Sequence, residues 1–165
     1  MSIDVGDPAP AFSLPRDGGG TLSLADLKGR PTVLYFYPKD DTPGCTKEAC
    51  GFRDAWAEVE AAGVQVVGVS KDSVKRHDNF KAKYDLPLTL VADENVALCT
   101  AFDVYKEKNM YGKKSMGIER STFLLDADGV VRKVWRKVKV DGHVPAVLRE
   151  AQALVSESVS DSAGA

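Results

Sequence analysis

Two cysteines lie five residues apart in the run P-K-D-D-T-P-G-C-T-K-E-A-C, which spans residues 38–50. The run follows an apolar segment typical of a strand and leads into a helical pattern, so Cys45 is predicted to lie where a strand passes into a helix. Unpaired backbone N–H groups and the positive end of the helix dipole favour a charged sulfur at such a place. The sequence therefore predicts a reactive thiolate at Cys45.

The three residues before this cysteine have the pattern of a helix cap and first turn. Thr42 offers a hydroxyl that can accept from a backbone N–H, Pro43 lacks a donor that a first turn does not need, and Gly44 lets the backbone approach a ligand. We predict that Thr42 Oγ1 and the N–H groups of Gly44 and Cys45 converge on the oxygens of a small polar substrate, as in an oxyanion hole. The alternative is that T-P-G simply starts a helix.

Cys50 is a candidate partner for Cys45. In an intact helix, five residues place the two Cα atoms about 8.6 Å apart, beyond the separation of about 6.8 Å that a disulfide normally spans. A bond between the two sulfurs would require the first turn or two of the helix to unwind, which would couple catalysis to local unfolding. The alternative is that Cys50 is a small apolar packing residue.

Four other residues have side chains that could take part in chemistry. Cys99 lies among apolar neighbours and is expected to be inert packing. His77 and His143 are far apart and flanked by charge, and no ligand spacing joins them to the cysteines, so no metal site is predicted. Arg120 precedes a buried strand at a point where its guanidinium could reach the thiolate, although a strand-end arginine needs no such role.

The composition limits the class of protein. The chain has 165 residues, with 22 Lys and Arg against 24 Asp and Glu, for a net charge of -2. This balance gives no indication of nucleic-acid or membrane binding, so a small molecule or another protein is the expected partner. Neither a secretory signal pattern nor a long apolar run is present, and a cytoplasmic location is predicted. Three cysteines are too few for a disulfide scaffold.

The elements that must position these residues alternate between strands and helices. Strands are predicted at 31–37, 64–69, 88–92, 121–125 and 130–138, and helices at 45–62, from 72 or 73 to 83, at 93–102 and at 144–155. Two short strands around a glycine-rich turn precede them, followed by a brief helical turn near Ser23, and 109–117 is predicted to be a loop. The order predicts an α/β fold with a mixed, mainly parallel sheet, flanking helices and an antiparallel hairpin at one side. We expect a single domain over 1–155 and a disordered tail at 156–165.

Two runs carry a family resemblance. Y-P-K-D-D-T-P-G-C-T-K-E-A-C and Y-G-K-K-S-M-G-I-E-R-S-T-F-L-L-D-A-D-G closely resemble the peroxiredoxins, and among them the bacterioferritin comigratory protein or PrxQ group. The likeness extends from G-D-P-A-P-A-F-S-L to V-L-R-E-A. It implies a thioredoxin-like fold with an N-terminal β extension, and thiol-dependent reduction of hydrogen peroxide and organic hydroperoxides without metal, flavin or haem.

The resemblance also implies the roles of the two cysteines. Cys45 matches the peroxidatic cysteine, which becomes a sulfenic acid, and Cys50 matches the resolving cysteine of the atypical two-cysteine type. Together they would form an intramolecular disulfide that thioredoxin or a related donor reduces. The group is often monomeric, so a monomer is expected, with a dimer as the alternative.

Four further residues match positions of the family site. Thr42 would orient the peroxide, Pro38 would shield the sulfur from water, and Arg120 would stabilise the thiolate and the developing charge. Glu48 falls at the position that orients the arginine. Cys99 is not part of the family motif.

Two other classes of protein remain open on the sequence alone. A thiol–disulfide oxidoreductase would share the fold but should carry C-x-x-C, which this chain lacks. A non-catalytic chaperone or interaction protein would keep the core without needing Cys45. Rapid consumption of peroxide separates both from a peroxidase.

Overall fold

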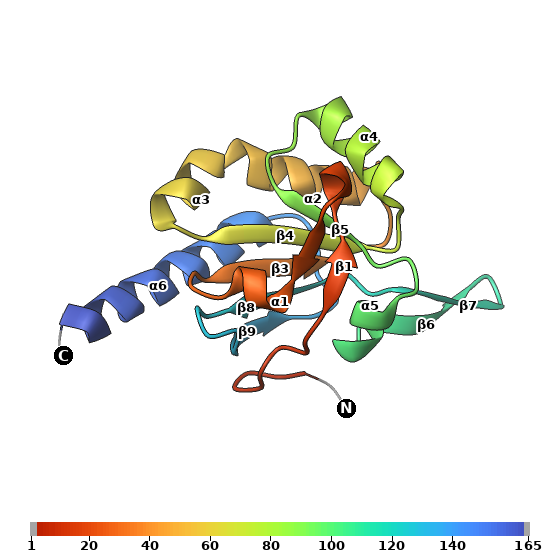
Figure 1. Ribbon diagram of the computed structural model, residues 1–165. Coiled ribbons are helices and arrows are strands. Elements are labelled where there is room, and N and C mark those ends of the chain that lie inside the picture. The colour runs from red at the N-terminus through yellow and green to blue at the C-terminus, as the bar shows by residue number, and fades with distance from the viewer. Residues whose placement is uncertain (1–2, 164–165) are drawn as a thin grey trace.

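The structure is a computed structural model that describes residues 3–163, without the side chains of Met110 and of residues 158–163. Five strands form its central sheet in the order β5-β4-β3-β8-β9 (Figure 1). In that order they are Thr89–Ala92, Gln65–Ser70, Thr32–Phe36, Ser121–Leu125 and Val131–Trp135. β3, β4 and β5 run parallel to one another, β8 runs antiparallel to β3, and β9 runs antiparallel to β8. The predicted mixed sheet with an antiparallel hairpin at one side is confirmed.

The central strand β3 explains how the core is divided. All five of its residues are buried between β4 and β8, as expected of a continuous apolar run with covered faces. Successive side chains point to opposite faces: Val33 and Tyr35 belong to one core cluster, and Leu34 and Phe36 to another. Each face of the sheet therefore has its own hydrophobic layer.

Different elements cover the two faces. The first face packs against α2 (Pro43–Asp54), α3 (Trp56–Ala62), α4 (Val74–Tyr84) and α6 (His143–Ala163). The second packs against α1 (Leu24–Leu27), α5 (Ala97–Ala101) and the N-terminal segment, which crosses the sheet in Figure 1. Cys45 belongs to the first cluster and Cys99 to the second. The sheet thus separates these two sulfurs.

The N-terminal segment forms the predicted small β extension. β1 (Ser13–Pro15) pairs antiparallel with β2 (Thr21–Ser23) around the short 3₁₀ helix η1 (Asp17–Gly19). Gly18 and Gly19 have φ of 80° and 92°, values that side chains rarely permit and that glycine adopts freely. Ser23 and Asp26 form a capping box that begins α1, so the predicted helical turn near Ser23 is confirmed.

Two predicted helices and one predicted strand are divided or shorter in the structure. The helix predicted over 45–62 is divided at Ala55 into α2 and α3; neither glycine nor proline marks the break, and the apolar spacing continues across it. The helix predicted over 93–102 is confined to α5. The strand predicted over 130–138 ends with β9 at Trp135.

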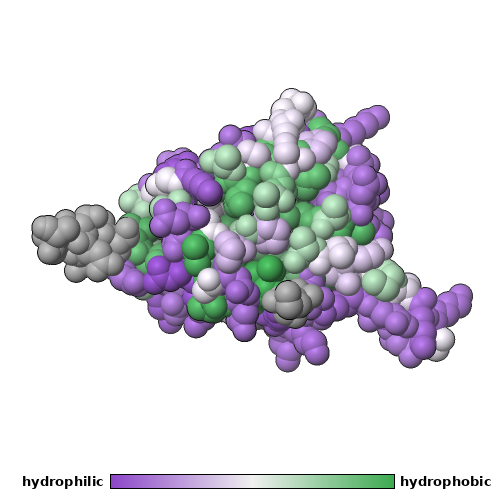
Figure 2. Space-filling model, turned by 60° about the horizontal axis from the view of Figure 1, so that its bottom comes forward, coloured by the Kyte–Doolittle hydropathy of each residue, from purple (hydrophilic) through white to green (hydrophobic). Residues whose placement is uncertain are grey.

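The prediction of a loop at 109–117 is wrong. Residues 105–118 form a separate two-stranded hairpin of β6 (Tyr105–Met110) and β7 (Lys113–Ile118). Tyr111 and Gly112 form its turn with positive φ at both positions, the geometry that joins antiparallel strands in two residues. The hairpin extends from the body at the right of Figure 1, and its hydrophilic tip is visible in Figure 2. Because the hairpin projects into solvent, neither strand has a buried face, and its sequence lacks the alternation of apolar and polar residues by which a strand is predicted.

The C-terminal helix extends beyond its predicted end at residue 155. α6 continues to Ala163, into the segment 156–165 that is predicted as a disordered tail. Adding residues to an existing helix costs far less than nucleating one, and no glycine or proline interrupts the segment before Gly164. Arg132 of β9 also donates to Glu157 at 2.8 Å, which ties the extension to the sheet. Residues 164–165 lie outside the described part. No helix within the described residues is long and apolar enough to cross a bilayer.

Candidate active site

Cys45 lies in the first turn of α2, directly after the loop that follows β3. Thr42 is extended, with φ −103° and ψ 156°, and Pro43 occupies the first helical position, as the T-P-G pattern predicted. Cys45 is 2% exposed. Its position near the unpaired N–H groups of a helix N-terminus favours a charged sulfur.

Thr42 does not make the predicted capping bond. No side-chain bond caps α2; instead the Thr42 hydroxyl donates to the Lys39 carbonyl at 2.8 Å. Because that bond uses the hydroxyl proton, the lone pairs of Oγ1 stay available to accept from another donor. The hydroxyl is therefore oriented as an acceptor at the start of the helix.

Arg120 links the cysteine to a buried carboxylate. It stands between β7 and β8, and β8 pairs with β3, the strand that leads to α2. One nitrogen, Nη2, donates to Cys45 Sγ at 3.3 Å, and the other, Nη1, donates to Glu48 Oε1 at 2.7 Å. A guanidinium that donates to sulfur stabilises the thiolate over the thiol. The structure thus brings Cys45, Arg120 and Glu48 together, as the family pattern implied.

Glu48 lies one helical turn after Cys45 and has no exposed side-chain surface. Burial raises its pKa to about 7, and the nearby Arg120 offsets part of that shift. Its second oxygen, Oε2, has no hydrogen-bond partner and lies 4.0 Å from His143 Nε2. The helix therefore carries a carboxylate beside the reactive sulfur at an appreciable desolvation cost.

His143 is a site neighbour that sequence reasoning missed. Its Nε2 lies 2.8 Å from Thr122 Oγ1, and the residue is buried. Burial, together with the positive charge of Arg120, lowers its pKa to about 4, so the ring is neutral at pH 7. Only the fold brings the start of α6 beside α2, because 94 residues of chain separate Glu48 from His143.

Cys50 and Pro38 are two further predicted site residues, and both are half-buried. Cys50 is half-buried against the same core cluster as Cys45, and both thiols are free. α2 is continuous from residue 43 to 54, so the expected separation of the two Cα atoms applies. Pro38 is half-buried at the start of the loop between β3 and α2, and its shielding of the sulfur stays a prediction.

Gly44 has a steric reason to be glycine. A Cβ built at this position would lie 3.0 Å from Arg120 Nη2, the nitrogen that donates to Cys45. The close approach predicted at Gly44 therefore involves the arginine of the site itself. A side chain here would force the guanidinium to move by a few tenths of an ångström.

In the role that the family resemblance implies for Cys45, replacing Gly44 by alanine is expected to slow its reaction with peroxide by roughly tenfold, because small displacements of an aligned donor are costly. Alanine otherwise favours a helix interior over glycine by about 0.5–1 kcal/mol, so folding stability should hold. Gly51→Ala is the matched control in the same helix, since its Cβ would meet Val144 at 3.1 Å, away from Arg120. Stopped-flow oxidation and urea unfolding measure both effects, and an equal slowing in the two variants would contradict the steric argument.

Comparisons with known proteins identify the family of this chain. Residues 5–134 match the model of the AhpC/TSA family. The chain is 61% identical over 148 residues to the bcp protein of Coxiella burnetii, covering 90% of this chain and 98% of that one. It is 50% identical over 149 residues to peroxiredoxin Bcp of Bacillus subtilis, covering 90% and 95%. The solved bacterioferritin comigratory protein of Xanthomonas campestris matches with a TM-score of 0.84 and 52% identity, over 87% of this chain and 92% of that one.

These likenesses, over about nine-tenths of the chain, establish its class. The chain belongs to the AhpC/TSA family and has the predicted thioredoxin-like fold with an N-terminal β extension. Within that family it is a peroxiredoxin of the Bcp/PrxQ group, and its activity is that of a thiol peroxidase. The two alternative classes, an oxidoreductase of the C-x-x-C type and a non-catalytic protein, are thereby excluded.

Proposed function

We propose that Cys45 attacks the peroxide and that Cys50 resolves the oxidised sulfur. The observation that carries this is the 3.3 Å bond from Arg120 Nη2 to Cys45 Sγ at the start of α2. The thiolate attacks one peroxide oxygen, the S–O bond forms as the O–O bond breaks, and the leaving oxygen takes a proton to become water or an alcohol. Thr42 Oγ1 accepts from the peroxide hydroxyl, and Arg120 stabilises the charge that develops on the oxygens.

Resolution requires α2 to unwind at its first turns. The thiol of Cys50 then attacks the Cys45 sulfenic acid, forming the disulfide and releasing one water. Unwinding breaks the 2.8 Å bond from Thr46 N–H to the Thr42 carbonyl and the contact between Lys47 and Asp141. It also returns the buried Glu48 to water, which offsets part of the cost. Phe52, fully buried further along the helix, limits how far the opening spreads.

The resolving role proposed for Cys50 is supported by the positions of the cysteines in this chain and not by the relatives. Separate solved structures of Xanthomonas campestris peroxiredoxin Q carry serine in place of one or the other of two cysteines, and those cysteines lie much farther apart along that sequence than Cys45 and Cys50 do along this one. Cys99 is unsuited to resolution because it is buried on the opposite face of the sheet. Burial and the neighbouring Asp93 also raise the pKa of the Cys99 thiol. Cys50 is the remaining thiol on the Cys45 side.

The proposed cycle of the two cysteines also suggests the substrates, the reductant and the cellular location of the protein. The Xanthomonas relative is described by its alkyl peroxide reduction activity, and we propose organic hydroperoxides together with hydrogen peroxide as substrates. Thioredoxin or a related dithiol donor would reduce the disulfide, and a cycle that ends in reduction suits the cytoplasm. A monomer is the proposed working unit because Cys45, Glu48 and Arg120 meet within one chain.

Intact mass after one equivalent of peroxide tests the cycle. The wild-type protein is expected to lose about 2 Da as the disulfide forms. Cys50→Ser should instead gain about 16 Da as a sulfenic acid that a sulfenate-specific reagent traps. A loss of about 2 Da in Cys50→Ser would assign resolution to another thiol, and an unchanged mass in both proteins would refute the cycle.

A further inference from the structure

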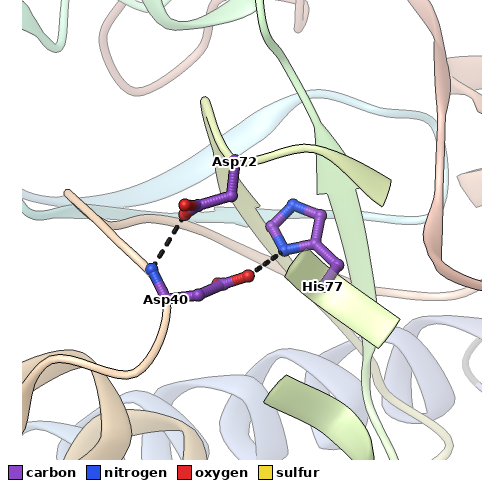
Figure 3. A group of neighbouring side chains, drawn as sticks. All are labelled: Asp40, Asp72 and His77. Atoms are coloured by element: carbon purple, nitrogen blue, oxygen red, sulfur yellow. Dashed lines mark hydrogen bonds and ion pairs between the residues drawn. The ribbon is translucent and has the colours of Figure 1, made fainter. Parts of the chain in front are cut away.

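A buried polar cluster lies beneath the loop between β3 and α2, and the peroxidase site leaves it without a role. Asp40, Asp72 and His77 meet there from the loop, from the end of β4 and from the first turn of α4 (Figure 3). Asp40 is 3% exposed and His77 is fully buried. His77 Nδ1 lies 2.6 Å from Asp40 Oδ2, and the Asp40 N–H donates to Asp72 Oδ2 at 2.8 Å.

The hydrogen-bond partners fix how the histidine is used. His77 Nε2 lies 2.9 Å from the Val91 carbonyl, which can only accept, so Nε2 carries a hydrogen. A second proton then lies between His77 Nδ1 and Asp40 Oδ2, whichever atom it is formally bound to. The bond between Asp40 and His77 is therefore a persistent link from the loop to α4.

This link holds the short segment that carries Pro38 and Thr42. Asp40 lies midway between these two residues, and its other carboxylate oxygen accepts from the Tyr37 hydroxyl. The next residue, Asp41, accepts from Lys83 and Tyr84 of α4, both at 2.7 Å. The loop is thus tied to α4 through two successive aspartates, and the buried tie is the one made by His77.

The alternative is that Asp40, Asp72 and His77 bind a metal ion. The ligand atoms of Asp40, Asp72 and His77 lie within 4.8 Å of one another. Each of them already has a partner in the protein, however: the proton shared with His77 occupies Asp40 Oδ2, and the Ser70 hydroxyl and the Asp40 N–H both donate to Asp72 Oδ2. A cation would have to displace these donors, so the geometry favours a link within the protein.

We infer that His77 is a positioning residue for peroxide reduction: acting through Asp40, it holds Thr42 and Pro38 at the place beside Cys45 that the peroxide requires. The inference rests on the proposed roles of Cys45 and Thr42. Arg120 reaches Cys45 from the position just before β8, on a path that does not include His77. Loss of the link is therefore expected to slow attack on peroxide without reducing the intrinsic reactivity of the thiolate.

Two substitutions separate the two bonds of the imidazole. In His77→Asn the amide nitrogen falls near the position of Nδ1 and can still donate to Asp40. In His77→Gln it falls near the position of Nε2 and can donate only to Val91. We expect His77→Asn to react with hydrogen peroxide at nearly the wild-type rate, and His77→Gln to react on the order of 10- to 100-fold more slowly.

Three measurements distinguish positioning from a structural role. Alkylation of Cys45 by iodoacetamide needs a thiolate but no peroxide alignment, so it should be unchanged in both variants. Urea unfolding should show His77→Gln to be less stable than His77→Asn, because glutamine leaves the buried Asp40 carboxylate without its donor, so the rates are compared without denaturant, where both variants are folded. Asp40→Asn combined with His77→Gln should be no slower than the slower single variant, since residues that act through one another are not additive.

The outcomes are decisive in both directions. Equal rates with peroxide in the Asn and Gln variants, or a parallel fall in alkylation, would overturn the inference and leave His77 as a packed core residue. Cys45→Ser, measured alongside, keeps this result separate from the proposed cycle: an active Cys45→Ser would refute the cycle. An inactive Cys45→Ser with a fully active His77→Gln would refute only the positioning role.

Discussion

Replacing Cys45 by serine is expected to reduce peroxide turnover to the rate of the protein-free blank. A serine hydroxyl in the same place is not ionised at neutral pH and cannot form a sulfenic acid, so neither the helix N-terminus nor Arg120 can make it react. The measurement is a coupled assay with thioredoxin, thioredoxin reductase and NADPH. In the same assay Cys50→Ser should oxidise once and then fail to be recycled.

Cys99→Ala is the matched control for the loss of a thiol. Cys99 is fully buried among apolar side chains on the other face of the sheet, and alanine removes its sulfur without burying a hydroxyl. We expect a modest loss of stability from the small cavity and turnover close to that of the wild type. Turnover that persists in Cys45→Ser and falls in Cys99→Ala would exchange the roles of the two cysteines.

The sequence could predict the parts of the site that are local. Residues 38–50 contain the loop, the helix start and both proposed redox cysteines, and the geometry of a helix N-terminus depends on a few neighbouring residues. The order of strands and helices likewise predicted the mixed sheet, since parallel strands joined by helices have few topologies. The predicted capping bond of the Thr42 hydroxyl is not made, because this hydroxyl donates to the Lys39 carbonyl instead. Local propensity does not predict that bond.

The missing parts depend on contacts between distant segments. His143 reaches Glu48 only because α6 returns across the sheet, and His77 reaches Asp40 only because α4 packs beside the loop. Charged residues flank both histidines in the sequence, yet both side chains are buried. A helix with one buried face can carry charge on all its other positions. Local charge therefore could not reveal which way either imidazole points.

Replacing Arg120 by methionine is expected to slow the reaction of Cys45 with peroxide on the order of 10²- to 10³-fold, as the loss of an aligned donor does in other active sites. Nη2 donates to Cys45 Sγ at 3.3 Å, so the substitution removes both the positive charge beside the sulfur and the donor that we propose stabilises the peroxide oxygens. Stopped-flow oxidation by hydrogen peroxide measures the rate directly. Arg136→Met is the matched control, because that guanidinium donates to the carbonyls of Ile3, Phe102 and Asp103, remote from Cys45.

The same substitution also destabilises the fold, and the two effects can be separated. Without Arg120 the buried Glu48 side chain loses the one hydrogen-bonded partner it has among the described residues, and breaking a buried ion pair typically costs about 3–5 kcal/mol. Protonation limits that cost near and below pH 7, because burial already raises the pKa of Glu48 to about 7. Adding Glu48→Leu removes the orphaned carboxylate, so the double variant should recover much of its stability in urea while its reaction with peroxide stays slow. If the rate recovered together with the stability, Arg120 would be serving the fold and not the chemistry of Cys45.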